Sequence, residues 1–429
     1  MSESTPKDSP ERFHLAIWGI NYSPEVTGIG PYNTLLAEFA RRRGHPVTVV
    51  TSFPYYPAWQ KDPVDRRFLF RKDLINGVSV HRTWHYVPRK VSALRRILHE
   101  ATFVATSFIR ILTLKRPDFL FVVSPPLALG FAAWVYRLLR RVPYAFHVQD
   151  LQPDAAASLG MIKPGRFVRA LYWLESFSYR KANLVSGISP GMLEAFRSKG
   201  VAESKLVYFP NPVVLPETVG GSPVRKGAFR ETHQVPENTF LVVYSGNVGV
   251  KQGLDTVVRA IRLLDHTVDL LLLICGEGAA KTALQELVGD CPKIRFLPLL
   301  SSDLYQQMLT DADLSLVSQQ ANSGAAFFPS KLLSLFASQT PVLAIADTES
   351  VVSEVILTHD AGFLCQPSDP ALLAEKLFDL KDQTAELKKR AANGYHFIQQ
   401  FEVSKVLPNF LDRLALSARR RNRTPDDKG

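Results

Sequence analysis

Cysteine is scarce in this chain of 429 residues, which contains 3 Cys, 4 Met and 5 Trp. Three cysteines, Cys275, Cys291 and Cys365, exclude a disulfide framework and the common zinc sites. Such sparse cysteine is typical of a reducing compartment. We find no cluster of His, Cys and carboxylate residues with metal-ligand spacing, and we therefore expect no metal.

Long hydrophobic runs are also lacking. Residues 1–11 are polar and charged, so we expect no signal peptide. The most apolar segment, residues 119–139, contains Pro125 and Pro126 after a short strand-like run. Because a spanning helix needs about 20 continuous apolar residues, we interpret the segment as strand, turn and helix.

The composition otherwise indicates a globular protein of two domains, with 46% hydrophobic and 21% charged residues. The formal net charge is +11, which favours polyanionic partners such as phosphorylated substrates or anionic lipid. Nucleic acid is not expected, since no pattern of stacking aromatics or helix-turn-helix accompanies the charge.

Strand-like and helix-like segments alternate twice along the chain, which predicts two parallel sheets covered by helices. The first series ends near residue 212, and the segment 213–235 is rich in Pro and Gly without apolar periodicity. The predicted organisation is a first domain at 12–212, a linker at 213–235, a second domain at 236–394, a helix at 395–417 and a basic disordered tail at 418–429.

The fold class predicted is therefore α/β, with two tandem doubly wound, Rossmann-like domains. Ligands of such sheets bind beyond the carboxyl ends of the strands. With two domains, we expect the site in a cleft between them.

The first strand leads into a loop containing Gly28 and Gly30, directly before a predicted helix. Backbone N–H groups at a helix N-terminus can face an anion, and glycine permits close approach. A turn that needs glycine only for its shape is equally compatible. The spacing is not that of a dinucleotide fingerprint, and the Walker lysine is lacking.

His147 and Asp150 stand at the carboxyl end of another predicted strand. A histidine there can donate to a sugar hydroxyl or a phosphate, and Asp150 can orient it. A core histidine beside a helix-capping aspartate is the alternative.

The second domain opens with a similar loop after its first strand. This loop contains Gly246, Asn247, Gly249 and Lys251, a plausible cradle for a diphosphate. A glycine-rich turn with a solvated lysine is the alternative reading.

Two further segments follow predicted strands. Gly276 and Gly278 would leave room for a base or ribose, although a tight turn explains them equally well. Ser330 and Lys331 begin a predicted helix, where a cation is unfavourable unless an anion binds. Lys331 is therefore a candidate ligand of the donor phosphates.

Two patterns have ambiguous meaning. Asp311 and Asp313 form a D-x-D pair, which we interpret as a helix-end feature and not a metal site. Residues 89–116 combine basic and apolar side chains, which suits an anionic membrane surface or a core-packing helix equally well.

Taken together, the motifs resemble those of family-4 retaining glycosyltransferases of the GT-B fold, over roughly residues 13–416. Within the family the chain is most similar to the colanic acid biosynthesis group, to which fucosyl transfer is attributed. The match is carried by four segments: Asn21-Tyr-Ser-Pro-Glu-Val-Thr-Gly-Ile-Gly30, Pro54-Tyr-Tyr-Pro-Ala-Trp59, Phe209-Pro-Asn211, and Tyr244-Ser-Gly-Asn-Val-Gly249 followed by Lys251-Gln-Gly253.

The resemblance implies an acceptor bound by the first domain, a nucleotide diphosphate sugar bound mainly by the second, and transfer with retention and without a metal. It implies that His147 contacts the transferring region, that Gly28 and Gly30 lie by the diphosphate, and that Lys251 and Lys331 neutralise it. It further implies that the last helix packs back on the first domain.

The chain departs from the family pattern at several positions. An arginine is usual where Asn247 stands, and a lysine is usual one position after Lys251. Two glutamates of the pattern align with Ala326 and Ser334, so both carboxylates are missing.

The sequence thus predicts hexose transfer, with GDP-fucose as one candidate donor, to a lipid-linked saccharide for exopolysaccharide at the inner face of the plasma membrane. A nucleotide-sugar epimerase or phosphorylase and a non-catalytic sugar-nucleotide-binding scaffold remain as alternatives.

Overall fold

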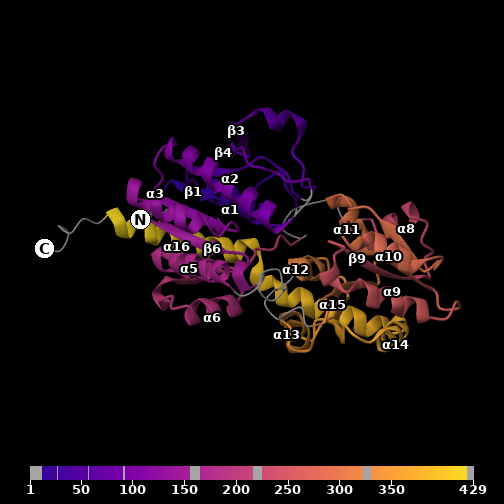
Figure 1. Cartoon of the computed structure of the whole chain (residues 1–429). Helices are drawn as coiled ribbons and strands as arrows, with labels where there is room; N and C mark the ends of the chain where they lie inside the picture. The colour runs from indigo at the N-terminus through magenta and orange to yellow at the C-terminus, as the bar shows by residue number, and fades with distance from the viewer. Residues whose placement is uncertain are drawn as a thin grey trace, which may run out of the picture. The chain divides into compact units, whose positions relative to one another are not determined.

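The computed structural model describes residues 12–26, 28–56, 58–89, 92–154, 165–215, 225–321 and 330–422. They form two compact units. The first runs to Pro212 and resumes at Val403, and the second extends from Val213 to Glu402. The last helix therefore belongs to the first unit (Figure 1).

The first unit is a sheet covered by helices. Its strands are β1 (Leu15–Trp18), β2 (Val47–Ser52), β3 (Phe70–Ile75), β4 (Val78–Thr83), β5 (Phe119–Ser124), β6 (Tyr144–Val148), β7 (Leu184–Gly187) and β8 (Leu206–Tyr208). Its helices are α1 (Gly30–Arg42), α2 (Ala93–Leu112), α3 (Leu129–Arg140), α5 (Arg166–Lys181), α6 (Pro190–Ser198) and α16 (Val403–Asn422), with short 3-10 turns η1 (Pro63–Arg67) and η2 (Glu203–Lys205).

The strand order in this sheet is β3-β4-β2-β1-β5-β6-β7-β8. All neighbouring pairs are parallel except β3 and β4, which form an antiparallel hairpin at one edge. The central strands are buried along their whole length, as expected for parallel strands covered on both faces.

Two layers of helices cover the sheet. One face packs against α2, α3, α5 and α6, which contribute Phe103, Tyr136, Tyr179 and Phe196 to a common core. The opposite face packs against α1 and α16. Phe410 of α16 stacks on Phe209, with ring centroids 3.6 Å apart.

The second unit is a six-stranded parallel sheet. Its strands are β9 (Phe240–Ser245), β10 (Leu270–Cys275), β11 (Ile294–Leu297), β12 (Leu314–Ser318), β13 (Val342–Ile345) and β14 (Phe363–Cys365). Its helices are α8 (Ala228–Thr232), α9 (Leu254–Leu263), α10 (Lys281–Val288), α11 (Ser302–Asp311), α12 (Ser330–Ala337), α13 (Val351–Thr358), α14 (Pro370–Lys381) and α15 (Thr384–Ile398), with 3-10 turns η3 (Val250–Gln252) and η4 (Gln399–Phe401). The strand order β11-β10-β9-β12-β13-β14 is that of the Rossmann fold.

The predicted fold class of two doubly wound α/β domains is confirmed, but three predicted segments differ. Residues 225–235 are not a linker, because they include α8 and bury Phe229 in the core of the second unit. The expected helix at 395–417 is divided into α15 and α16, because the chain between them pairs with Val213, whose N–H donates to the Phe401 carbonyl at 2.8 Å. The expected disordered tail is helical to Asn422, because Ala418 is buried against the first unit; residues 423–429 lie outside the described residues.

Residues 119–139 form β5 and most of α3, as interpreted from the two prolines. Among the helices that the structure describes, none is both long and apolar enough to cross a membrane.

Candidate active site

Each sheet has a point where the chain leaves one strand and continues on the opposite side. In the first unit this point lies between β1 and β5, and in the second between β9 and β12. The loops after β1 and β9 carry the glycines singled out from the sequence. Ligands of doubly wound sheets bind at such points, so both loops are in the expected position.

In the second unit, the loops after β9 and β10 are joined by backbone hydrogen bonds. The N–H of Gly246 donates to the carbonyl of Cys275 at 2.9 Å, and that of Val248 donates to the carbonyl of Glu277 at 2.9 Å. A Cβ at Gly276, which has φ 150°, would overlap the Gly246 carbonyl oxygen. Gly276 and Gly278 therefore let the two loops pack closely, and the space beside each is filled by protein.

Lys331, in the first turn of α12, extends to the Gly246 turn. Its Nζ lies 3.7 Å from the ring centroid of Tyr244, and a Cβ at Gly246 would lie 2.9 Å from it. Burial lowers the pKa of this ammonium to about 7. Within the described residues, no carboxylate forms an ion pair with it. A partly buried cation without a counter-ion, beside a glycine turn at the switch point, is suited to a phosphate.

The loop after β9 also contains the predicted residues Asn247, Gly249 and Lys251. Asn247 and Lys251 are exposed, and the N–H of Gly249 donates to the Gln252 side chain at 3.1 Å. Gly253, with φ 55°, precedes α9 and leaves the first N–H groups of that helix without a side-chain cap. The N–H groups of Gly246, Val248 and Gly249 are thus bonded within the protein, and the uncapped N-terminus of α9 is what this loop offers to an anion.

Ala326 and Ser334 stand at the two positions where the family pattern has glutamates. Ala326 lies outside the described residues. Ser334 lies on α12, where its hydroxyl is 3.1 Å from the Tyr305 hydroxyl and donates to the Lys331 carbonyl at 2.8 Å. The Ser334 side chain thus forms its hydrogen bonds with other residues of the protein. The backbone of Ser330 begins α12.

In the first unit, the loop after β1 leads into α1. Gly28 has φ 68°, and Gly30 is the first residue of the helix. A Cβ at Gly30 would lie 3.1 Å from the Glu25 carbonyl oxygen. Ile29 provides no side-chain cap and the first turn lacks acidic residues, so the N-terminus of α1 keeps its positive potential.

His147, at the end of β6, is buried with both ring nitrogens bonded. Its Nδ1 lies 3.0 Å from the Ser186 hydroxyl, and its Nε2 lies 2.9 Å from the amide nitrogen of Gln149. That amide also donates to Asn211 at 2.9 Å. Burial lowers the pKa of His147 to about 3, so the ring is neutral at physiological pH. We did not predict Gln149 or Ser186 from the sequence, although Asn211 belongs to a motif that carried the resemblance.

The structure also contains a cavity of about 740 Å³ in the first unit that sequence reasoning missed. It is bordered by the loop after β1, the segment after β2 and the β3–β4 hairpin. Its lining includes Pro24, Glu25, Pro54, Tyr55, Tyr56, Gln60, Lys61, Asp62, Pro63, Asp65, Arg71 and Arg82.

Buried charges hold the walls of this cavity together. Glu25 accepts hydrogen bonds from the N–H groups of Tyr55 and Tyr56, both at 3.0 Å, and from the Asn21 amide at 2.7 Å. Burial nevertheless raises the pKa of Glu25. The carboxylate thus connects the loop after β1 to the segment after β2.

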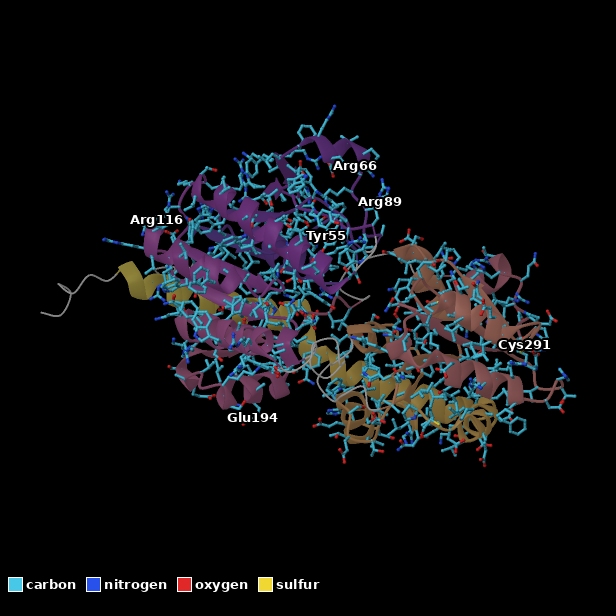
Figure 2. All side chains as sticks on the ribbon, in the orientation of Figure 1. Tyr55, Arg66, Arg89, Arg116, Glu194 and Cys291 are labelled. Carbon is cyan, nitrogen blue, oxygen red and sulfur yellow. The ribbon has the colours of Figure 1, made fainter. Side chains whose placement is uncertain are left out.

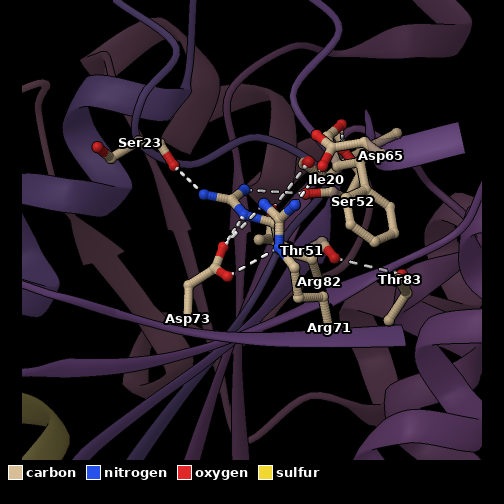
Figure 3. Close-up of polar contacts among 10 residues, drawn as sticks. Ile20, Ser23, Thr51, Ser52, Asp65, Arg71, Asp73, Arg82 and Thr83 are labelled. Atoms are coloured by element: carbon tan, nitrogen blue, oxygen red, sulfur yellow. Dashed lines mark hydrogen bonds and ion pairs between the residues drawn. The ribbon is translucent and has the colours of Figure 1, made fainter. Parts of the chain in front are cut away.

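A second network lies behind the same walls (Figure 3). Arg82 donates to Asp73 at 2.6 Å and to the carbonyls of Ser23 and Ser52. Arg71 donates to Asp73 at 2.8 Å and to Asp65. Because both guanidinium groups form their hydrogen bonds within the protein, we interpret Arg71 and Arg82 as residues that hold the cavity walls in position.

The cavity is also lined by side chains that could bind a ligand, and these include an ammonium and a tyrosine hydroxyl. Burial lowers the pKa of Lys61 to about 8, and its ammonium lies 4.8 Å from the Trp84 ring centroid. Tyr56 is 37% exposed, and the pKa of its hydroxyl is raised by burial, by Glu25 and by nearby Asp150. Tyr55 lies among the packed side chains of the unit (Figure 2). Aromatic rings beside carboxylate, amide and ammonium groups are suited to a polar ligand with apolar faces.

The D-x-D pair has a structural role. Asp311 accepts hydrogen bonds from the N–H groups of Phe229 and Arg230 at the start of α8. Asp313 pairs with the Arg230 guanidinium at 2.7 Å. In the described parts of the chain, no group of three His, Cys, Asp or Glu residues could hold a metal ion.

Comparisons with known proteins agree with this architecture. Residues 27–212 match the glycosyl transferase 4-like domain, and residues 225–397 match glycosyl transferases group 1. The colanic acid biosynthesis glycosyl transferase WcaI of Escherichia coli is 32% identical, over 82% of this chain and 86% of that protein. The glycosyltransferase WbjE of Pseudomonas aeruginosa is 27% identical, over 58% of this chain and 61% of its own length.

Solved structures share the fold at low identity. Anabaena HepE, in complex with UDP and glucose, has a TM-score of 0.67 at 15% identity, covering 94% of this chain and 100% of its own. Sucrose-phosphate synthase from Thermosynechococcus elongatus has a TM-score of 0.72 at 16% identity, covering 95% and 100%. The chain therefore belongs to the group 1 glycosyltransferases, family 4 of the GT-B fold.

Proposed function

We propose that this glycosyltransferase moves a hexose, with retention and without a metal ion, from a nucleotide diphosphate sugar to a lipid-linked saccharide. The relatives named above support a role in exopolysaccharide synthesis of the colanic acid type. GDP-fucose is our first candidate donor, and the UDP-bound relative makes UDP-sugars the main competitor.

The observation that carries the proposal is the ammonium of Lys331 beside the Gly246 turn, which has no ion-pair partner among the described residues. As the bond between the anomeric carbon and the phosphate oxygen breaks, negative charge accumulates on the leaving diphosphate. A cation that is already held at that position stabilises the transition state without reorganisation. We assign this role to Lys331 and Ser330, assisted by Lys251.

The remaining predicted residues have supporting roles in the proposal. Gly246, Asn247 and Gly249 supply the turn that admits the phosphates. Gly276 and Gly278 support that turn from below and border the nucleotide. We assign Gly28 and Gly30, at the uncapped N-terminus of α1, to binding of the donor diphosphate.

We assign to His147 the orientation of the transferring sugar through its neutral ring. The bonds from Ser186 and Gln149 fix both ring nitrogens, so the ring acts through position and not through proton exchange. Asp150 lies near Tyr56, where a carboxylate can accept a hydrogen bond from a sugar hydroxyl.

The acceptor saccharide, in this proposal, binds in the cavity of the first unit. The lining has three basic residues, Lys61, Arg71 and Arg82, and three acidic ones, Glu25, Asp62 and Asp65. This balance favours neutral sugar rings over a free phosphate. The exposed ring of Tyr56 and the neighbouring prolines suit the apolar faces of such rings.

We also propose a peripheral location at the cytoplasmic face of the plasma membrane, with residues 89–116 as one contact. In α2, Leu94, Ile97, Leu98 and Ile109 are exposed, beside Arg95 and Arg96. Residues 90 and 91 lie outside the described residues. An exposed apolar stripe flanked by arginines is suited to an anionic interface.

The test is a donor panel measured in two ways. Thermal shifts with nucleotides and nucleotide sugars identify the donor, since a ligand that binds the folded protein raises its stability. Transfer of radiolabel from that donor to a lipid-extractable acceptor establishes the reaction. Label retained on a free sugar phosphate or on an isomerised nucleotide sugar would instead indicate a phosphorylase or an epimerase, and binding without turnover would indicate a scaffold.

A further inference from the structure

An aromatic ridge on the outer side of α3 and α5 is separate from every site described above. Rings from both helices interlock: Phe177 lies 5.0 Å from Trp134, 5.3 Å from Trp173 and 5.8 Å from Phe131, between ring centroids. Trp173 is 57% exposed and Phe131 is 40% exposed. We name this surface the α3–α5 ridge, and it also includes the exposed Leu138 and Leu139.

The ridge is larger than packing in the first unit requires. The buried sides of the two helices, with Ala133, Tyr136 and Tyr179, already fill the core beneath them. Trp134 packs partly against this core, whereas Phe131, Trp173, Leu138 and Leu139 remain exposed. Contiguous exposed apolar patches of this kind mark interaction surfaces.

The charged residues of the two helices are almost all basic. The helices and the residue after α3 carry seven basic side chains: Arg137, Arg140, Arg141, Arg166, Arg169, Arg180 and Lys181. None of them forms an ion pair with a carboxylate in the part of the chain that the structure describes. The one carboxylate on the two helices, Glu175, is fully buried and pairs with Lys199 at 2.7 Å.

The first turn of α5 strengthens this observation. It contains Arg166 and Arg169 and lacks an acidic residue, so two cations stand at the positive end of the helix. Such an arrangement is locally unfavourable, and an external anion would offset it. One further carboxylate lies close to α5: Asp154 accepts a hydrogen bond from the Tyr172 hydroxyl at 3.0 Å and pairs with Lys199 at 2.6 Å.

We infer that the α3–α5 ridge inserts into the interface of an anionic lipid bilayer. Tryptophan and phenylalanine favour the boundary between headgroups and acyl chains, and the surrounding arginines pair with lipid phosphates. A second copy of the chain is disfavoured as occupant, because it would bring seven cations against seven. The ridge is distinct from the α2 stripe, and the inference does not require the donor or acceptor to be the ones proposed.

The experiment measures binding of the full chain to vesicles of phosphatidylcholine alone and of equal parts phosphatidylcholine and phosphatidylglycerol. We expect binding to the anionic vesicles, with a blue shift of tryptophan emission that is lost in Trp173→Phe. Arg166→Gln combined with Arg169→Gln should weaken partitioning about thirtyfold, since each basic residue near the surface contributes about fivefold. Trp173→Ala combined with Leu139→Ala should weaken it about tenfold or more.

Two controls make the outcome decisive. Leu263→Ala combined with Leu357→Ala removes equally exposed leucines of the second unit and should leave binding unchanged. If replacing Leu94, Ile97 and Leu98 of α2 abolishes binding while the ridge variants bind normally, the inference is overturned. Self-association in solution that is lost in the Trp173 variants would also overturn it. Donor thermal shifts on the same samples report the proposed function separately, because the ridge variants should retain them.

Discussion

Replacing Lys331 by methionine should stabilise the protein while weakening its binding of the donor. Methionine retains most of the length of the side chain but cannot be charged. Burial lowers the pKa of Lys331 from 10.5 to about 7. The difference between the two pKa values corresponds to about 4 kcal/mol of lost stability at pH 7. Because the side chain is only partly buried, solvent screening reduces this amount, and we expect a gain of about 2 kcal/mol.

The dependence on pH distinguishes this effect from better packing. Between pH 7 and 10.5 the unfolded chain holds a proton on Lys331 that the folded protein has released. The stability of the unsubstituted protein therefore rises with pH over this window, and the advantage of Lys331→Met decreases by about half by pH 9. Binding of an anionic donor favours the charged form, so donor affinity should fall as the pH rises above 7.

Calorimetry of the transition of the second unit, at pH 7 and 9, measures the effect directly. A gain of about 2 kcal/mol corresponds to about 4–8 °C for a unit of this size. Lys388→Met, on the exposed side of α15, is the matched control and should leave the transition unchanged. Titration with GDP and UDP should show at least tenfold weaker binding by Lys331→Met. A variant that is less stable at pH 7, or equally stabilised at both pH values, would refute the reasoning.

Three further variants test the other parts of the site. Gly246→Ala places a Cβ 2.9 Å from the Lys331 ammonium at φ 142°, so calorimetric titration should show donor affinity reduced more than tenfold, and unchanged affinity would contradict the assigned turn. Glu25→Gln should raise the KM for the acceptor severalfold and leave the KM for the donor unaltered, because it disturbs only the walls of the cavity in the first unit; equal effects on both would argue against that cavity. The pKa of His147 lies at about 3, so the unfolded chain takes up a proton there as the pH falls below 6.5. Stability is lost progressively towards pH 3, and His147→Gln should flatten this loss in acid denaturation while lowering transfer; full activity of the variant would remove His147 from the site.

The sheets were predictable because their strands are buried on both faces. Residues 270–275 are a continuous apolar run, and β10 occupies the same residues. The β3–β4 hairpin was not predicted, because Phe70–Ile75 contains three consecutive charged residues and lies at an edge of the sheet. The turn at Asn76 and Gly77, both with positive φ, carries a hairpin signal that could have identified it.

The candidate site was predictable where it depends on a local motif. Gly246 follows a recognisable strand and Lys331 lies in the first turn of a recognisable helix, so their chemistry could be argued from neighbouring residues. The roles of Glu25 and Arg82 depend on partners 30 or more residues away, and only the folded chain brings these together. The pairing of Gln149 with Asn211 was hidden for the same reason.

The placement of α16 has a consequence for how the chain is made. The first unit lacks one of the two helices that cover one face of its sheet until residues 403–422 have been synthesised, whereas the second unit is a single continuous segment. On the ribosome, the second unit can therefore complete its core before the first, reversing the usual order. Loss of the last helix would remove Phe410, which stacks on Phe209 and contacts Phe121, so a truncation at the C-terminus would uncover a core built from the first half of the sequence.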